Sequence, residues 1–177
     1  MSRYWRGADE EARIVIDDEV KAVVLAIVIV AGVFAIAQLI SSGRVVEPFS
    51  ALGLLGPEMK IGDYPKNVLV NQSINLYLFI DNHEGRVMYY VIYAKLGDKS
   101  TVINENTSAN APILDTYEVI LPHGENTTIP VSLRVTKPQE NARLIFEMWV
   151  YDPEKDEVRY HGRWVQLWLN VTAPQMP

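Results

Sequence analysis

The chain has 177 residues, of which 49% are hydrophobic, no cysteine and a formal net charge of -6. This composition is too apolar for a disordered chain, and the acidic balance excludes the basic surface that a nucleic-acid binder needs. The absence of cysteine excludes disulfide scaffolds, thiolate metal sites and cysteine nucleophiles.

The first predicted element is an apolar run over residues 22–40, in which only Gln38 is polar. A helix of this length spans roughly 28 Å, close to the hydrocarbon thickness of a bilayer. Asp17 and Asp18 precede the run, as residues at a helix N-terminus should. A cleaved signal sequence, the competing interpretation, has a shorter apolar core of about 7 to 15 residues. We therefore predict a transmembrane helix over residues 20–41, surrounded by membrane lipid.

The flanking charges predict how this helix is oriented in the cell membrane. Four basic residues precede it: Arg3, Arg6, Arg13 and Lys21. Arg44 follows it, and the next basic residue is Lys60. Under the positive-inside rule, the N-terminus is then cytoplasmic and the long C-terminal part is extracellular.

Four glycosylation sequons all fall in this predicted extracellular part, and they begin at Asn71, Asn106, Asn126 and Asn170. Asn106 and Asn126 lie in loop-like segments, which makes them the better acceptors. Asn170 lies in or just beyond a strand and is the weakest.

The apolar run also contains two pairs of small residues spaced four apart: Ala22, Ala26, Ala31 and Ala35. Such pairs let a second helix approach closely and indicate helix-mediated association in the membrane. The alternative is that these alanines only fill the span.

From residue 49 onward the sequence changes to apolar residues that alternate with polar ones, the pattern of half-buried strands. Alternation and turn residues predict strands over residues 49–54, 74–81, 87–96, 114–121, 129–135, 144–150 and 165–171. No helical period interrupts them, so the fold class is an all-β, immunoglobulin-like antiparallel sandwich of about seven strands attached to one N-terminal transmembrane helix. The predicted units are a cytoplasmic charged tail (1–19), the helix (20–41), a linker (42–48), the sandwich (49–173) and a C-terminal tail (174–177).

Few residues in the predicted sandwich point to chemistry. The three histidines, His83, His123 and His161, fall in or near predicted turns, which favours solvated side chains over metal ligands. A hairpin carries Asp152, Glu154, Asp156 and Glu157, which we interpret as a solvated turn, with a calcium site as the alternative. Gly-x-Ser-x-Gly, His-Glu-x-x-His and glycine-rich phosphate motifs are absent from the sequence. We therefore expect no enzyme activity, no cofactor and no metal.

Aromatic residues are more informative, because they lie opposite the aliphatic side chains of the last two predicted strands. Trp149 and Tyr151 belong to one of these strands, and Trp164 and Trp168 to the other. If the two strands pair, one sheet presents an aromatic patch on its outer side, as partner-binding surfaces do. The alternative is that the 97–113 segment covers this face.

Four short segments of the sequence resemble an archaeal membrane family. They are Leu-Gly-Pro at the end of residues 49–57, Tyr64-Pro65, Asn82-His83-Glu84, and the last strand over residues 167–171. This family is the domain of unknown function 1616, and the resemblance covers about residues 49–172. It implies an extracellular β-sandwich, an archaeal source and archaeal glycosylation of the sequons. Many members carry several spans before this domain, whereas this sequence has one, and the family implies no activity.

These observations favour a non-enzymatic accessory or scaffold subunit at the archaeal cell surface or in a membrane complex. Its partners would be other membrane or surface-layer proteins. One alternative is an archaellum-stator-like or pilin-like filament component, because Lys21-Ala22 before the apolar run loosely resembles a prepilin cleavage site. Another is a glycan- or ion-binding module, with its site in the 97–113 and 122–128 loops.

Overall fold

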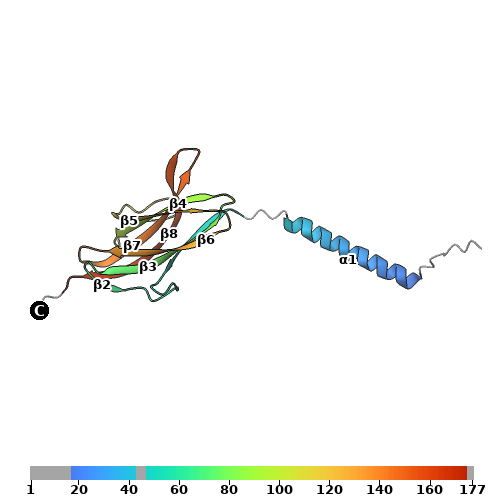
Figure 1. The fold of residues 1–177 in the computed structure, drawn as a ribbon, viewed down its shortest axis with the longest axis horizontal. Coiled ribbons are helices and arrows are strands. Elements are labelled where there is room, and N and C mark those ends of the chain that lie inside the picture. Colours follow the sequence, from blue (N-terminus) through green and yellow to red (C-terminus); the bar gives the residue numbers. More distant parts are fainter. Residues whose placement is uncertain (1–16, 43–46, 175–177) are drawn as a thin grey trace, which may run out of the picture. The chain divides into compact units, whose positions relative to one another are not determined.

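A computed structural model describes residues 17–42 and 47–174. Most of the predicted charged tail, with Arg3, Arg6 and Arg13, lies outside the described residues, as do linker residues 43–46 and the last three residues. The chain divides into two compact units, residues 1–46 and 47–177. Each unit is described by itself (Figure 1).

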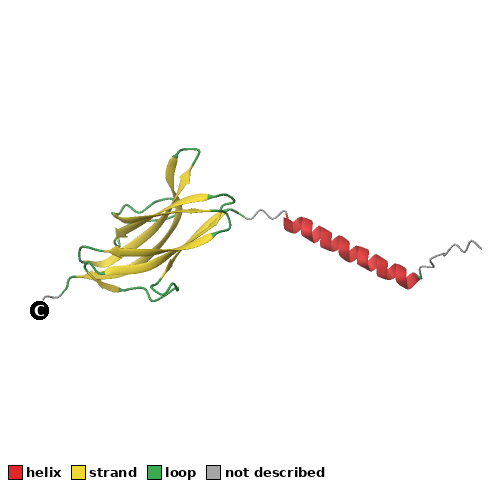
Figure 2. Cartoon of the chain, in the orientation of Figure 1, coloured by secondary structure: helices red, strands yellow, loops and turns green. Residues whose placement is uncertain are grey.

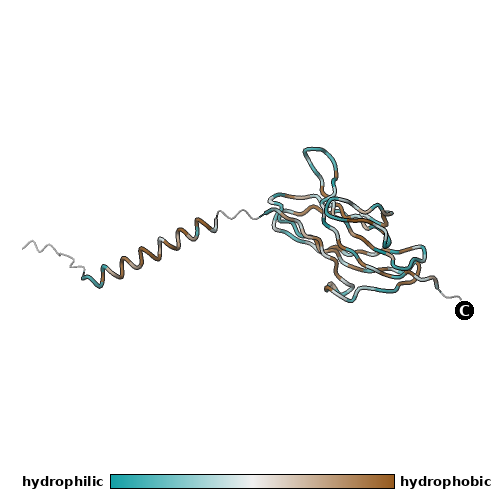
Figure 3. The backbone as a smooth tube through the Cα atoms, turned by 180° about the vertical axis from the view of Figure 1, so that it is seen from behind, coloured by the Kyte–Doolittle hydropathy of each residue, from teal (hydrophilic) through white to brown (hydrophobic). Residues whose placement is uncertain are grey.

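The described part of the first unit is one helix, α1 (Asp18–Ser42). The backbone N–H of Lys21 donates to the carbonyl of Asp17 at 3.0 Å, so Asp17 is the N-cap, and Lys21 also pairs with Asp18 at 2.8 Å. Hydrophobic residues cover nearly its whole length (Figure 3), and its apolar side chains are exposed. Among the described residues, α1 is the one helix long and apolar enough to cross a membrane. The helix forms although β-branched residues, which have a lower helix propensity, are common in it.

The second unit is a β-sandwich of two sheets (Figure 2). Its strands are β1 (Phe49–Leu55), β2 (Asn67–Leu69), β3 (Ser73–His83), β4 (Met88–Gly97), β5 (Ile113–Leu121), β6 (Asn126–Arg134), β7 (Gln139–Asp152) and β8 (Glu157–Thr172). The smaller sheet has the order β1-β3-β6 and the larger has the order β2-β8-β7-β4-β5. This arrangement confirms the predicted fold class of a sandwich behind one apolar helix.

The core lies between the two sheets and is built from the inward-facing residues that alternation predicted. Every second residue of β3 is buried, and β4 and β7 supply the largest buried side chains from the other sheet. The fully buried side chains include Ile74, Leu76, Leu78, Ile80, Tyr90, Ile92, Leu144, Phe146 and Met148. Burying a side chain of this size contributes about 1.5–3 kcal/mol, so this layer is the main source of stability.

Two features differ from the sequence prediction. The sandwich has an eighth strand, β2, which pairs in parallel with β8 rather than antiparallel. Three residues are too few to show a period of two, so pattern analysis missed it. The last hairpin, β7–β8, is also longer than predicted, and its tip projects beyond the body of the sandwich (Figure 2).

Candidate functional site

The four aromatic residues of the predicted partner surface all lie on the outer face of the larger sheet. β7 carries Trp149 and Tyr151, and β8 carries Trp164 and Trp168. Trp168 is 40% exposed, whereas the other three are half-buried. The patch is therefore not one continuous exposed surface.

The reason is the connection between β4 and β5, residues 98–112, which we call the strap. It folds back over the outer face of the larger sheet and reaches β8, where the Tyr160 hydroxyl donates to the carbonyl of Asn104 at 3.1 Å. At the other end, Arg143 of β7 donates to the carbonyl of Thr101 at 2.6 Å. The strap thus covers the middle of the face on which the aromatic patch was expected.

A buried ion pair fixes the strap to the sheet. Lys95 of β4 and Glu147 of β7 lie 2.8 Å apart, with their side chains 7% and 0% exposed. Glu147 accepts the backbone N–H of Ala109 at 2.5 Å, and Lys95 donates to the carbonyl of Ala109 at 2.9 Å. The indole N–H of Trp149 donates to the second oxygen of Glu147 at 3.1 Å. Both charges are therefore compensated where water is excluded, which a buried pair requires.

The strap bears out the alternative that the 97–113 segment covers this face. The buried ion pair beneath it was not predicted, although the sequence carries a signal for a strand covered on both faces. In β7, residues 144–148 are buried without interruption, because one side faces the core and the other faces the strap. In sequence this appears as a continuous apolar run broken by a single charge, Glu147, which is typical of a strand covered on both faces.

The strap leaves two areas of the outer face exposed. At one end lies the hairpin patch, defined by Val87, Tyr89, Ile120, Tyr151 and Pro153, which line a shallow cavity of about 240 Å³. Val87 is 62% and Ile120 66% exposed. Such neighbouring aliphatic side chains left in water are what binding surfaces expose.

At the other end, the ring of Trp168 lies under the guanidinium of Arg143, 5.3 Å from the ring centroid. Leu69 of β2, which is paired with Thr172 of β8, is 48% exposed on the same sheet. Trp and Arg are both enriched among residues that dominate protein–protein binding.

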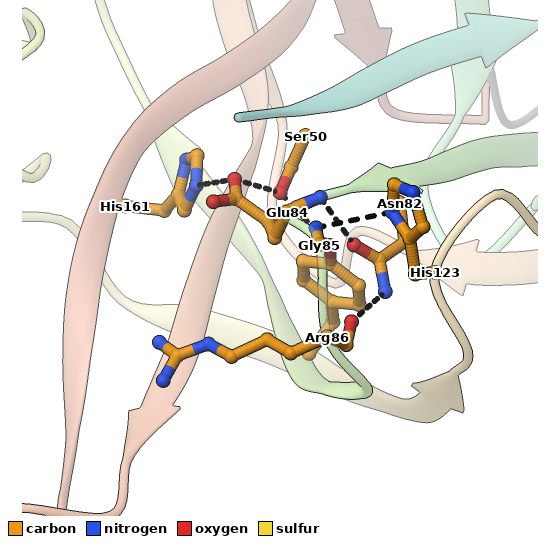
Figure 4. A network of polar contacts seen from close by, with 8 residues as sticks. Ser50, Asn82, Glu84, Gly85, Arg86, His123 and His161 are labelled. Atoms are coloured by element: carbon orange, nitrogen blue, oxygen red, sulfur yellow. Dashed lines mark hydrogen bonds and ion pairs between the residues drawn. The ribbon is translucent and has the colours of Figure 1, made fainter. Parts of the chain in front are cut away.

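A second candidate site is a polar cluster at the Asn82-His83-Glu84 motif (Figure 4). Asn82 is fully buried, and its amide donates to the carbonyls of Arg86 and Leu121 at 2.8 and 2.7 Å. Its oxygen accepts the backbone N–H of Glu84 at 2.9 Å, which fixes the turn. The motif thus holds Glu84 in place.

Glu84 accepts hydrogen bonds from two other strands. Ser50 of β1 donates to its carboxylate at 2.6 Å, and His161 of β8 approaches the same oxygen at 3.2 Å. Because Ser50 uses its proton toward Glu84, the Tyr90 hydroxyl donates to Ser50 at 2.8 Å. The cluster therefore joins both sheets, and Ser50 bonds to a carboxylate and a phenol rather than to a histidine. His161 reaches Glu84 and not Ser50, so the order of contacts differs from that of a serine–histidine–acid triad.

The expectation that all three histidines are solvated turn residues is wrong for His161. It lies within β8, where residues 161 and 162 form a bulge opposite β7, and its side chain is 16% exposed. A bulge re-aims the side chain it carries, here toward Glu84. His83 stacks on Phe49 with ring centroids 4.7 Å apart, and its ring also meets the edge of His123 at 5.9 Å. Within the described residues, no three acidic or histidine side chains could hold a metal ion.

The cluster predicts a pH dependence of stability. Burial lowers the pKa of His161, and the charges of Arg163 and Arg159 act in the same direction, although the hydrogen bond with Glu84 and the charge of Glu84 act to raise it. The Nδ1 atom of His161 is buried without a hydrogen-bond partner. Burial by itself raises the pKa of Glu84, but hydrogen bonds from Ser50 and His161 together outweigh it and hold the pKa below its ordinary value. A depressed folded pKa stabilises the fold above the unfolded value and loses this contribution as pH falls. Stability should therefore drop below about pH 6.5, the ordinary value of histidine, and further below the ordinary value of glutamate.

Thermal unfolding of the detergent-solubilised chain between pH 7.5 and 5 measures this dependence. Replacing His161 with glutamine keeps a donor toward Glu84 and removes the titration, so the variant should have a flatter profile. An equally steep profile in H161Q would show that another group is responsible.

Glycosylation of the four sequon asparagines stays a prediction. Asn71, Asn106 and Asn126 are exposed, with Asn126 beginning β6 instead of lying in a loop, whereas Asn170 lies within β8. The oxygen of Asn170 accepts the backbone N–H of Asn141 at 2.9 Å, so a glycan there would compete with a hydrogen bond.

Among the acidic hairpin residues, Asp152 pairs with Arg159 at 3.4 Å and Asp156 accepts from Tyr151 at 2.6 Å.

The four alanines of the apolar run, Ala22, Ala26, Ala31 and Ala35, all lie within α1 and are exposed. Ala26 and Ala31 share a shallow apolar groove with Phe34. Lys21-Ala22 also lies inside α1, close to its start.

The described residues thus form a β-sandwich of two packed sheets that follows one candidate transmembrane helix in the chain. Residues 44–170 match the family described as "Domain of unknown function (DUF1616)", and the chain belongs to this family. The resemblance seen in the sequence motifs is thereby confirmed, while the archaeal source stays a prediction. No curated protein matches the chain at a significant level.

Several solved structures share the sandwich at low sequence identity. The CARDB domain of a Pyrococcus furiosus protein, crystallised with di-metal ions, is 13% identical with a TM-score of 0.46 and covers 73% of this chain and 95% of its own. A chain in the complex of zinc 2-glycoprotein and prolactin inducible protein from human seminal plasma is 12% identical with a TM-score of 0.44. The match covers 73% of this chain and 99% of that one. A β-glucosidase from Listeria innocua, in complex with glucose, is 15% identical with a TM-score of 0.43. The match covers 70% of this chain but only 16% of the β-glucosidase. With TM-scores below 0.5, these likenesses say nothing about the function of the chain.

Proposed function

We propose that the protein is a membrane-anchored, non-enzymatic accessory or scaffold subunit. In this proposal α1 anchors it in the cell membrane, and the extracellular sandwich binds a protein partner through the outer face of its larger sheet. The observation that carries the proposal is the hairpin patch, where Val87 and Ile120 are 62% and 66% exposed.

The anchor and its orientation rest on two features. The apolar stretch of α1, Asp18–Ser41, is long enough to cross a bilayer. Basic residues gather before it and are scarce directly after it, which favours a cytoplasmic N-terminus.

A non-enzymatic role is supported by how the polar groups of the sandwich are used. Ser50 and His161, from the two sheets, both hydrogen-bond to Glu84. Lys95 and Glu147 are committed to the strap. Groups with these bonds contribute to the fold, and each would lose a partner by engaging a substrate.

The hairpin patch has the chemistry of a protein interface. Two aliphatic side chains lie beside two tyrosines whose hydroxyls are already bonded, Tyr89 to Glu118 at 2.5 Å and Tyr151 to Asp156 at 2.6 Å. The ring faces therefore remain for contact with a partner, and burying them releases water. Arg86 also lines the cavity, so the partner should supply a polar or acidic group for it. The Trp168 area, with Arg143 and Leu69, would extend the contact along the same face.

Substitution of Ile120 by glutamate tests the proposal, because it places a charge in the centre of the patch without touching the core. Partners captured with the full-length chain from native membranes should be lost with I120E. The matched control is I61E, since Ile61 is 86% exposed and does not line the patch. Partners retained by I120E, or lost equally with I61E, would contradict the assignment of the contact to the hairpin patch.

Trp168→Ala tests the second area in the same experiment. A partner that spans the face should bind W168A less tightly, by about 1–2 kcal/mol or more if Trp168 dominates the contact. Unchanged capture by W168A would confine the contact to the hairpin patch.

A further inference from the structure

The strap also forms part of a cavity. Its residues 108–111 border this space of about 420 Å³ on the outer face of the larger sheet. Tyr93 of β4 and Trp149 of β7 form one side of this cavity, and Ser108 and Asn110 of the strap form another. This volume lies in the range of about 300–1,000 Å³ that is typical of small-ligand sites. The cavity is separate from the hairpin patch, which has its own lining.

The aromatic side of the cavity is a corner. The rings of Tyr93 and Trp149 lie 5.4 Å apart at 73°, and Tyr160 lies 5.6 Å behind Trp149. Because Trp149 already donates its indole N–H to Glu147, it offers a ligand only the ring surface that the ammonium of Lys95, 5.7 Å from the ring centroid, leaves free. A ligand that fits must therefore present apolar C–H or ring faces on this side.

The charge of the cavity floor is already compensated. Lys95 lines the cavity, but its ammonium is bonded to Glu147 at 2.8 Å and to the carbonyl of Ala109 at 2.9 Å. An anionic ligand would have to compete with Glu147, and a cationic one would meet Lys95. The site therefore favours an uncharged ligand.

The strap side is polar and leads to a second cavity. Ser108, Asn110 and Ala111 also line a neighbouring cavity of about 720 Å³, on the opposite side of this strap segment. That cavity is bordered by hydroxyl and amide groups, among them Thr107 and Gln139. Asn110 is exposed, and the described residues hold no hydrogen-bond partner for its side chain. A ligand seated on the aromatic corner could thus extend hydroxyls across the strap.

The geometry points to a binding site for a neutral oligosaccharide at the strap, with one sugar ring packed on Trp149 and Tyr93 and its hydroxyls bonded to Asn110 and Ser108. A pyranose ring has an apolar C–H face and a polar rim, and it carries no charge. These three properties correspond to the aromatic corner, the strap groups and the compensated floor. The site does not depend on the protein partner proposed above.

Binding of defined hexasaccharides to the full-length chain in nanodiscs tests this assignment. The probes are α-linked glucose, β-linked glucose and mannose hexamers, with a hexauronate as the charged counterpart, measured by isothermal titration. At least one neutral hexamer should bind at millimolar concentration or below, and more tightly than the uronate. W149A should weaken that binding by about tenfold, since stacked aromatic surface of this kind is worth about 1.4 kcal/mol.

Trp149 also contacts Glu147, so W149A could disturb the fold, and N110A provides a second variant on an exposed side chain. It should weaken binding several-fold, whereas I61A, which alters an 86% exposed side chain outside both cavities, should leave it unchanged. The assignment is overturned if no neutral hexamer binds, if the uronate binds more tightly, or if I61A weakens binding as much as N110A.

Discussion

Replacing Glu147 with alanine is expected to destabilise the sandwich by about 3–5 kcal/mol, the cost of leaving one member of a buried ion pair without its partner. Lys95 would keep a 7% exposed ammonium with no carboxylate nearby, and the backbone N–H of Ala109 and the indole of Trp149 would each lose an acceptor. Urea unfolding of the detergent-solubilised chain, followed by tryptophan fluorescence, gives the free energy. The strap should also become sensitive to proteolysis between residues 98 and 112.

Two further variants show whether burial causes this effect. Arg159, whose side chain is 51% exposed, pairs with the half-buried Asp152 at 3.4 Å, so R159A should change stability by at most about 1 kcal/mol. The double variant K95M/E147Q removes both charges but keeps an acceptor for Ala109, and it should recover part of the loss. A cost below about 1 kcal/mol for E147A would mean that the strap does not depend on the ion pair.

Gly162→Ala is the second change with a large expected effect, about 2–5 kcal/mol, because two costs combine. Gly162 has a φ of 84°, which side-chain-bearing residues rarely adopt, and an added Cβ would lie 2.5 Å from the carbonyl oxygen of Glu105 in the strap. The strap backbone would have to move away from the bulge of β8. The same unfolding experiment measures this loss.

Gly124→Ala is the matched control, since its φ is 78° but an added Cβ meets nothing within 4 Å. It should show the conformational cost alone, about 1 kcal/mol. If G162A and G124A lost the same stability, close packing of the strap on the bulge would not contribute.

The parts of the fold that could be predicted are those in which a pattern of apolar residues has a single physical explanation. In β3, Ile74, Leu76, Leu78 and Ile80 alternate because one face meets the core and the other meets solvent, and all four are buried. The apolar run of α1 was equally clear, since length and composition alone make it a candidate span.

The parts that could not be predicted depend on contacts between distant segments. The strap has almost no regular structure, and nothing in its composition says that Ala109 will meet Glu147, 38 residues further on. His161 was misassigned for a similar reason, because the bulge that turns it toward Glu84 is set by the register of β7 with β8. The polar cluster joins residues of four strands, so the Asn82-His83-Glu84 motif is visible in the sequence but the contacts of Glu84 with Ser50 and His161 are not.

Single-cysteine labelling tests most directly whether the sandwich lies outside the cell behind a membrane anchor. The chain has no cysteine, so each introduced thiol is the only one. Lys99, exposed in the strap, and Ser2, before the helix, are suitable positions. In intact cells, a membrane-impermeant maleimide should label K99C in the membrane fraction and should label S2C only after lysis. Labelling of S2C but not K99C in intact cells, or recovery of K99C in the soluble fraction, would contradict the proposed topology.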